Sequence, residues 1–231
     1  MTDVPMHPYY AQRRRAITED FAHNLQLAWP HFERELAAPI LDGLTERLHE
    51  ELQRRLRLLP YVGGSQGRMT PFFEQGAGFF AVGRVLRSSG VPMETTSLLM
   101  RKTFLARFEA LTPEQRTAFG RDWLSNGNRA FLEVAAAESR ARKNPGDFVY
   151  ELVPAGTAPD GAPFEFGIDY TECGFCKLCK AHGDEDLLPV MCGLDEEIYA
   201  IRGIKLVRTT TLASGGACCN FRFGPLPADP A

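Results

Sequence analysis

The hydrophobic pattern of this chain changes its period near residue 145, and no other feature constrains the fold as strongly. Before Asn144-Pro145-Gly146, apolar residues recur every three or four positions, as in helices; after it, apolar and polar residues alternate, as in strands. A run of helices followed by a run of strands is typical of an α+β protein. We therefore expect a mainly helical part over residues 1–145 and an antiparallel α+β part over residues 146–231, packed as one compact unit.

The helical part is expected to contain five helices. The strongest pattern lies between Phe32 and Leu59, where leucine or isoleucine recurs every four residues and Pro60 then ends the run. Thr112 and Pro113 have the residue types that favour a helix N-cap and first turn. The predicted helices cover residues 11–28, 32–59, 71–88, 92–110 and 112–143.

The segment PYVGGSQGRMTPFF, residues 60–73, separates two of these helices and is rich in glycine and aromatic residues. A phosphate-binding loop is one interpretation, but that motif needs a preceding strand and a lysine followed by serine or threonine. Neither feature is present. The pattern therefore favours a loop between helices, with room to border a pocket.

The C-terminal part is expected to form a small antiparallel sheet with one cysteine-bearing helix. The runs DFVYELV and PFEFGIDY alternate apolar and polar residues, which predicts two strands. The runs IKLVRTTTL and ACCNFRF flank the turn sequence ASGG, which predicts a hairpin. Between these pairs, CGFCKLCKAHG predicts a short helix that ends at Gly183, and the tail GPLPADPA is expected to fray.

Composition disfavours several classes of protein. A chain of 231 residues with 44% hydrophobic and 24% charged residues is an ordinary globular chain. No stretch approaches the ~18 apolar residues of a membrane span, and a net charge of −3 disfavours a dedicated nucleic-acid binder. The N-terminal region lacks the apolar core of a signal peptide. We therefore expect a cytoplasmic protein with reduced thiols and a small-molecule partner, and its oligomeric state stays open.

All six cysteines lie between residues 173 and 219. In CGFCKLCK, Cys173, Cys176 and Cys179 are three residues apart, so on a helix their side chains span an arc of ~120° on one face. With Cys192 or His182 as a fourth ligand, they could bind zinc or an iron–sulfur cluster. This pattern supports one alternative function, a non-enzymatic metal-binding or small-ligand sensor module. A thiol redox protein is a weaker alternative, because the C-x2-C pair lacks a βαβ context.

The same cysteines are candidate nucleophiles. A single buried cysteine often serves only as a small hydrophobic residue, but six in one segment favour a functional site. A cysteine beside a base can attack an electrophilic carbon. Cys173, Cys192 and Cys219 are the candidates for attack, with His182 or Asp195 as the base.

Two arginines are candidates to bind an anionic group of a substrate. On a strand, Arg208 and Thr209 point to opposite faces. Across a hairpin that turns at ASGG, Arg208 can lie near Asn220 or Arg222. A guanidinium matches a carboxylate well because it donates two parallel hydrogen bonds.

Several blocks of the sequence occur in an order that resembles a known family. The residues YTECGFCKLCKAHG, LLPVMCGLDEE, RTTTLASGG and CCNFRF resemble the L-2-amino-thiazoline-4-carboxylic acid hydrolase family. The resemblance is specific over residues 166–223 and looser back to residue 58. It implies hydrolytic opening of a cyclic amidine, with a thiazoline carboxylate as the prototype substrate. The positions that match the family pattern are Cys173, Cys192, Asp195, Arg208, Thr209, Thr211, Gly215, Cys219 and Phe221.

The resemblance also implies roles and departures. Asn220 stands where the family usually has aspartate, and an amide cannot act as a base. Cys176, Cys179 and Cys218 are not general in the family. The predicted catalytic set is Cys192, Cys219, Asp195 and Cys173, and the predicted substrate-binding set is Arg208, Thr209, Asn220 and Arg222.

Overall fold

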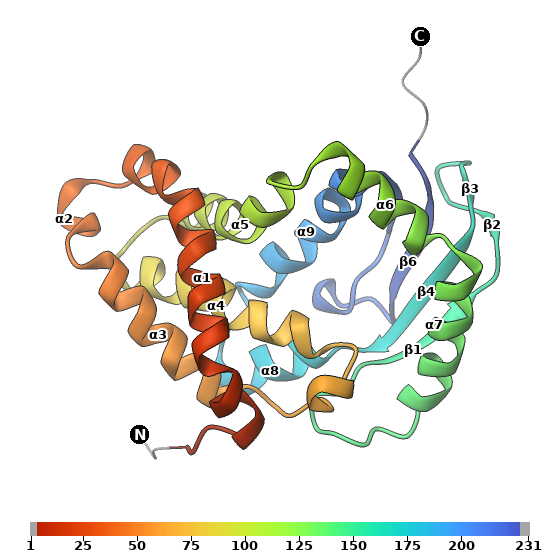
Figure 1. Ribbon diagram of the computed structural model, residues 1–231, viewed down its shortest axis with the longest axis horizontal. Coiled ribbons are helices and arrows are strands. Elements are labelled where there is room, and N and C mark those ends of the chain that lie inside the picture. The colour runs from red at the N-terminus through yellow and green to blue at the C-terminus, as the bar shows by residue number, and fades with distance from the viewer. Residues whose placement is uncertain (1–3, 227–231) are drawn as a thin grey trace, which may run out of the picture.

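The computed structural model describes residues 4–226 and places a group of helices beside a small sheet (Figure 1). The helical elements are α1 (Pro8–Glu35), α2 (Ala38–Leu41), α3 (Leu44–Leu58), η1 (Gly64–Gln66), α4 (Thr70–Ser88), α5 (Met93–Glu109), α6 (Pro113–Trp123) and α7 (Asn126–Ser139). They are followed by β1 (Val149–Val153), β2 (Gly156–Thr157), β3 (Pro163–Phe164), β4 (Phe166–Glu172), α8 (Gly174–His182), α9 (Leu188–Ile201), β5 (Ile204–Val207), η2 (Leu212–Ser214) and β6 (Cys219–Pro225). This order confirms the predicted α+β class. Most of the tail expected to fray lies outside the described residues.

The helix predicted over residues 32–59 is divided in the structure. α1 continues through Pro30 and ends at Glu35, and α3 begins after Gly43, whose φ of 61° is left-handed. The prediction of one continuous helix over residues 32–59 is therefore wrong, because the backbone is extended at Leu36 and Ala37 and is interrupted again after the short helix α2, at Asp42 and Gly43. Glycine readily adopts the left-handed conformation found at the second break. The buried stripe itself is confirmed by the complete burial of Leu44, Leu48, Leu52 and Leu56.

The helix predicted over residues 112–143 is also two helices. Its start is confirmed, because the Thr112 side chain accepts the Gln115 N–H and the Gln115 side chain accepts the Thr112 N–H. Its interior breaks at Ser125, whose hydroxyl accepts the Asn128 N–H at 3.1 Å and caps α7. A serine side chain can replace a helical partner in this way, so it favours helix starts over helix interiors.

Four strands form one antiparallel sheet in the order β1-β4-β6-β5. Ile168 of β4 lies opposite Phe221 of β6, and Leu206 of β5 lies opposite Phe223. In β6 the buried Cys219, Phe221 and Phe223 alternate with half-buried residues, so one face of the sheet packs against the core. The predicted small antiparallel sheet and the pairing of its last two strands are confirmed.

The strand predicted over residues 204–212 ends early, at Val207. The Asn220 side chain explains this, because its Oδ1 accepts the N–H groups of Thr209 and Thr210 at 3.0 and 2.8 Å. Those two donors are therefore satisfied without a neighbouring strand. The connection between β5 and β6 is a wide loop that contains η2, in place of the tight turn expected at ASGG.

Helix α9 was not predicted. Its sequence, LPVMCGLDEEIYAI, contains a proline and a glycine, which lower helix propensity. Pro189 is tolerated because it lies in the first turn, where its missing N–H would have no helical partner. α9 packs against α5 on one side and β5 on the other, and Figure 1 shows it between the helical group and the sheet.

The inner face of the sheet is covered by aromatic side chains from two helices. Tyr199 of α9 and Trp123 of α6 pack on Phe223, with ring centroids at 4.8 and 5.4 Å. The buried side chains of the helical group and the sheet form one connected core. Within residues 4–226, no helix has both the length and the apolar content that crossing a membrane requires.

Candidate functional site

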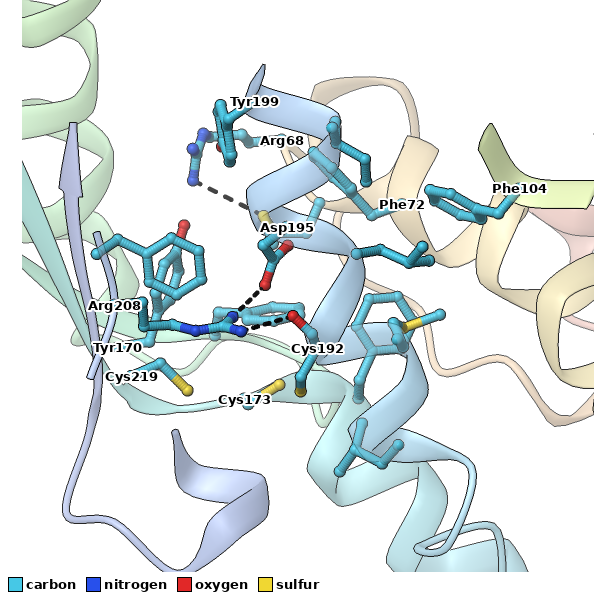
Figure 2. A pocket seen from close by; sticks show the side chains of 18 residues that line it. Arg68, Phe72, Phe104, Tyr170, Cys173, Cys192, Asp195, Tyr199, Arg208 and Cys219 are labelled. Atoms are coloured by element: carbon cyan, nitrogen blue, oxygen red, sulfur yellow. Dashed lines mark hydrogen bonds and ion pairs between the residues drawn. The ribbon is translucent and has the colours of Figure 1, made fainter. Parts of the chain in front are cut away.

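A pocket of about 120 Å³ lies where the helical group meets the sheet. Its 18 lining side chains come from the start of α4 and the loop before it, from α5, α8 and α9, and from the sheet side (Figure 2). Ten of them are phenylalanine, leucine, isoleucine or methionine side chains. The other eight carry polar, charged or thiol groups, namely Arg68, Arg208, Tyr170, Tyr199, Asp195, Cys173, Cys192 and Cys219. A mostly apolar pocket with a few converging polar groups is typical of a small-molecule site.

Five of the predicted site residues line this one pocket, namely Cys173, Cys192, Asp195, Arg208 and Cys219, and so does Phe221, which matches the family pattern. Cys173 joins β4 to α8, and Cys219 begins β6. Cys192 and Asp195 are three residues apart on α9 and therefore share a helix face. Arg208 directly follows β5. Cys173, Cys192 and Cys219, which come from different elements, thus border a single cleft.

Asp195 and Arg208 form an ion pair in the pocket wall (Figure 2). Arg208 Nη1 donates to Asp195 Oδ2 at 2.5 Å, and Arg208 Nη2 donates to the carbonyl oxygen of Cys192 at 2.6 Å. The Arg208 side chain is only 8% exposed. Both terminal nitrogens of Arg208 are therefore occupied by groups of α9, and the pair fixes the carboxylate relative to the Cys192 backbone.

The pocket gives the Asp195 carboxyl an unusual pKa. Burial raises this pKa to about 6, although the neighbouring Arg208 charge opposes the rise. About a third of the side chain, 32%, is open, and it faces the pocket. A carboxyl that titrates near neutral pH can both accept and donate a proton under physiological conditions.

The pocket thiols of Cys192 and Cys219 are held in their neutral form. Burial raises the pKa of Cys192 to about 12, and the Asp195 charge adds to that effect. Burial also raises the pKa of Cys219, although the Leu212 N–H opposes this by donating to its Sγ at 3.1 Å. Because the thiolate is the reactive form, either cysteine needs a base to act as a nucleophile.

Cys173 and Cys176 behave as a pair at the start of α8. Hydrogen bonding to Cys176, together with burial, raises the pKa of Cys173 well above its ordinary value. The same interaction lowers the pKa of Cys176 to about 7, against the effect of its own burial. Cys176 is therefore the thiol of this pair that ionises first.

The geometry gives no support to the metal site proposed from Cys173, Cys176, Cys179 and Cys192. In the part of the chain that the structure describes, no group of three or more histidine, cysteine, aspartate or glutamate side chains is placed to hold a metal ion. Cys179 is fully buried and has the charges of Asp184 and Arg55 among its neighbours. His182, the other candidate ligand and base, does not line the pocket either.

Three predicted substrate-binding residues, Thr209, Asn220 and Arg222, do not line the pocket. Asn220 and Arg222 alternate with Cys219 and Phe221 along β6, so they point to the opposite face. Asn220 donates from Nδ2 to Thr209 Oγ1 at 2.8 Å and organises the loop after β5. Arg222 pairs with Asp169 of β4 at 2.6 Å. Their positions favour a structural role over contact with a substrate.

Arg68 and the aromatic residues of the pocket other than Phe221 were not predicted from the sequence. Arg68 and Phe72 come from the glycine-rich segment expected to border a pocket, so that segment carried the only available signal. Tyr199 was missed because α9 was missed. Tyr170 lies on the predicted strand 163–170, but strand alternation alone does not distinguish a pocket residue from a core residue.

Over residues 96–223, the sequence matches the model of the family described as L-2-amino-thiazoline-4-carboxylic acid hydrolase. The matched part includes α9 and the five predicted residues that line the pocket. Residues 58–95, which resemble the family more loosely, precede the match. No curated protein and no solved structure matches the chain.

Proposed function

The chain belongs to the L-2-amino-thiazoline-4-carboxylic acid hydrolase family, and we propose that its pocket hydrolyses a small cyclic amidine carboxylate, with a thiazoline carboxylate as the prototype. One observation carries this proposal. Asp195, with a pKa of about 6, is held by Arg208 in the wall of an apolar pocket that also contains Cys192 and Cys219.

The bond changes define what the site must supply. In a 2-amino-thiazoline, the amidine carbon is bonded to the ring sulfur and is electrophilic. Attack at this carbon gives a tetrahedral centre. Its collapse opens the ring by breaking either the C–S bond, which releases a thiol, or the ring C–N bond, which releases an amine. One water molecule is consumed overall, so the site must move a proton from the nucleophile to the leaving group.

Asp195 is the residue suited to that proton transfer. As a carboxylate it can accept the proton of the attacking group, and as a carboxylic acid it can return the proton to the leaving sulfur or nitrogen. Its pKa near 6 makes both states accessible close to neutral pH. Arg208 acts as a positioning residue, because its two terminal nitrogens hold Asp195 and the backbone beside it.

Cys192 is the favoured nucleophile among the cysteines. It lies on the same face of α9 as Asp195, and the Asp195 charge is among the causes that raise its pKa. A thiol that is neutral at pH 7 must transfer its proton as it attacks, and we assign Asp195, three residues along the same helix, as the acceptor. The attack bonds the Cys192 sulfur to the amidine carbon and the ring bond breaks; a water molecule then attacks the same carbon, and the Cys192 sulfur leaves and regains its proton, which releases the product. Cys219 is the second candidate, because it lines the same pocket from β6.

The test is turnover of a panel of small cyclic amidine and thiazoline carboxylates, followed by mass spectrometry. Asp195→Asn should lower kcat/KM by about 100-fold or more, which is the usual contribution of general acid–base catalysis. Glu196→Gln is the matched control: it removes the neighbouring exposed carboxylate and should retain most of the activity. Circular dichroism should show that both variants stay folded.

Cys192→Ser separates two routes for the attack. A loss as large as that of Asp195→Asn indicates attack by the thiol, whereas retained turnover indicates attack by a water that Asp195 activates. If Asp195→Asn and both variants Cys192→Ser and Cys219→Ser keep wild-type rates, the proposed chemistry is wrong. If the wild-type protein binds panel members without converting them, the pocket serves a binding function instead.

A further inference from the structure

We infer that Arg68 is the carboxylate anchor of the pocket, so that the ligand is an apolar ring compound with an anionic group at the end away from the cysteines. The inference rests on the proposed function for the chemistry of that ring. It reassigns a role that the sequence gave to Arg208 or Arg222.

Arg208 and Arg222, the two arginines predicted to bind a substrate carboxylate, have no pair of free N–H donors directed into the pocket. The two terminal nitrogens of Arg208 already donate hydrogen bonds to Asp195 and to the Cys192 carbonyl oxygen. Arg222 is bound to Asp169 and lies on the other face of the sheet. A substrate carboxylate that approached Arg208 would compete with Asp195 for the same nitrogens. That competition would release the residue on which the chemistry depends.

Arg68 is different because its charge has no acidic partner. Its Nη1 donates to the sulfur of Met69 at 3.7 Å, and its guanidinium lies 5.3 Å from the centroid of the Tyr150 ring. Its other hydrogen-bonding neighbours are the phenol groups of Tyr150 and Tyr170, which are not carboxylates. A thioether is a weak acceptor. Among the described residues, no carboxylate forms an ion pair with Arg68, although its side chain is half-buried and lines the pocket. A buried guanidinium without a counter-charge costs free energy, which an anionic ligand would offset.

The glycine-rich segment before α4 fixes this arginine in place. Gly63 has a φ of 97°, and a Cβ at Gly67 would lie 1.9 Å from the Val62 carbonyl oxygen. The chain therefore folds back tightly just before Arg68, and a side chain at position 67 would prevent that turn. This conformation accounts for the glycines of the segment without a phosphate-binding motif.

The arrangement of the pocket assigns the two ends of the ligand. In the view of Figure 2, Arg68 lies beside Tyr199 at one end, the three cysteines gather at the other, and Asp195 with Arg208 lies between. A ring placed here would direct its carboxylate to Arg68 and its amidine carbon to Asp195 and Cys192. The intervening walls are aromatic, including Phe72, so they favour a flat or apolar ligand body.

The experiment measures binding, not turnover, by isothermal titration calorimetry with three probes. The first is 2-aminothiazole-4-carboxylate, a planar ring with both groups; the second is 2-aminothiazole, which lacks the carboxylate; the third is benzoate, which lacks the amidine. Arg68→Gln should weaken binding of both carboxylates about 10- to 100-fold and leave 2-aminothiazole within about twofold. Arg68→Lys keeps the charge without the fork, so it should show a smaller loss for the same two probes.

Arg13→Gln is the control, because Arg13 lies on α1 and pairs with Glu74 outside the pocket. It should change none of the three affinities, and thermal melting should show that every variant is folded. Equal binding of the carboxylates by wild type and Arg68→Gln overturns the inference. So does failure of the wild type to bind either carboxylate at millimolar concentration. If benzoate binding depends on Arg68 while no thiazoline is hydrolysed, the inference that Arg68 binds a carboxylate is supported and the proposed hydrolase function is wrong.

Discussion

Replacing Asp184 with alanine is expected to destabilise the protein strongly without touching the pocket. Asp184 directly follows α8 and its C-cap Gly183, and it is 1% exposed. It accepts hydrogen bonds from Arg55 of α3 and Arg84 of α4. Arg84 also donates to the carbonyl oxygens of His182 and Gly183, each at 2.7 Å. This network attaches the end of the cysteine-bearing helix to the helical group.

The magnitude follows from the burial of the partners. The Arg55 side chain is 5% exposed, so Asp184→Ala leaves a buried charge with less compensation. Breaking a buried ion pair from one side costs about 3–5 kcal/mol. For a chain of this size, each kcal/mol lowers Tm by about 2–4 °C, so Tm should fall by about 6–20 °C. Glu51 still accepts from Arg55 Nε at 2.7 Å, which favours the lower half of that range.

Asp186→Asn is the matched control, two residues along the same segment. Asp186 pairs with Arg87 at 2.5 Å, but the two side chains are 41% and 38% exposed. A pair in water contributes about 0–1 kcal/mol, so Tm should change by less than about 4 °C. The assay is differential scanning calorimetry of Asp184→Ala and Asp186→Asn. A third variant, Asp184→Asn, removes the charge while keeping the volume of the side chain. Similar Tm values for the Asp184 and Asp186 variants would refute the argument that this network holds α8.

Two further predictions concern titration, one of Asp195 in the pocket and one of Cys176 on α8. If ionised Asp195 is the base, kcat/KM should rise with pH up to a pKa of about 6 and fall about tenfold per pH unit below it. A pH–rate profile checks this, and an acidic limb that persists in Asp195→Asn would assign it to another group. Iodoacetamide should modify Cys176 first, with a midpoint near pH 7. Peptide mass spectrometry across pH measures that midpoint, which should move upward in Cys173→Ser; an unchanged midpoint would show that Cys173 does not lower the pKa of Cys176.

The α+β class of the fold was predictable because the spacing of hydrophobic residues, which differs between helices and strands, can be read from short stretches of sequence. Helix starts with side-chain caps, such as Thr112, and a helix end with a left-handed glycine, Gly183, were also predictable. The interruption at Gly43 was not, since the surrounding ladder of leucines continues across it. The early end of β5 depends on Asn220, eleven residues away from Thr209, and propensity does not report such a contact.

The residues that line the candidate site were more predictable than the hydrogen bonds and ion pairs between them. Cys173, Cys192, Cys219, Asp195 and Arg208 could be selected from residue type and family resemblance, and these five do line one pocket. The partner of Arg208 could not be selected, because a guanidinium suits a substrate carboxylate and a protein carboxylate equally well. Only the fold shows that Asp195 occupies Arg208 and that Arg68 has no acidic partner among residues 4–226.

Helix α9, which was not predicted from the sequence, matters most for the proposed chemistry because it carries both Cys192 and Asp195. On a loop, the spacing of Cys192 and Asp195 would imply nothing about their relation, whereas on a helix residues three apart share a face. Because α9 packs between α5 and β5, that face is turned toward the pocket and away from bulk water. The same burial raises the pKa of both Asp195 and Cys192. The proposed proton transfer between them therefore depends on the helix as a unit, since unwinding it would separate the two groups and restore their ordinary acidities together.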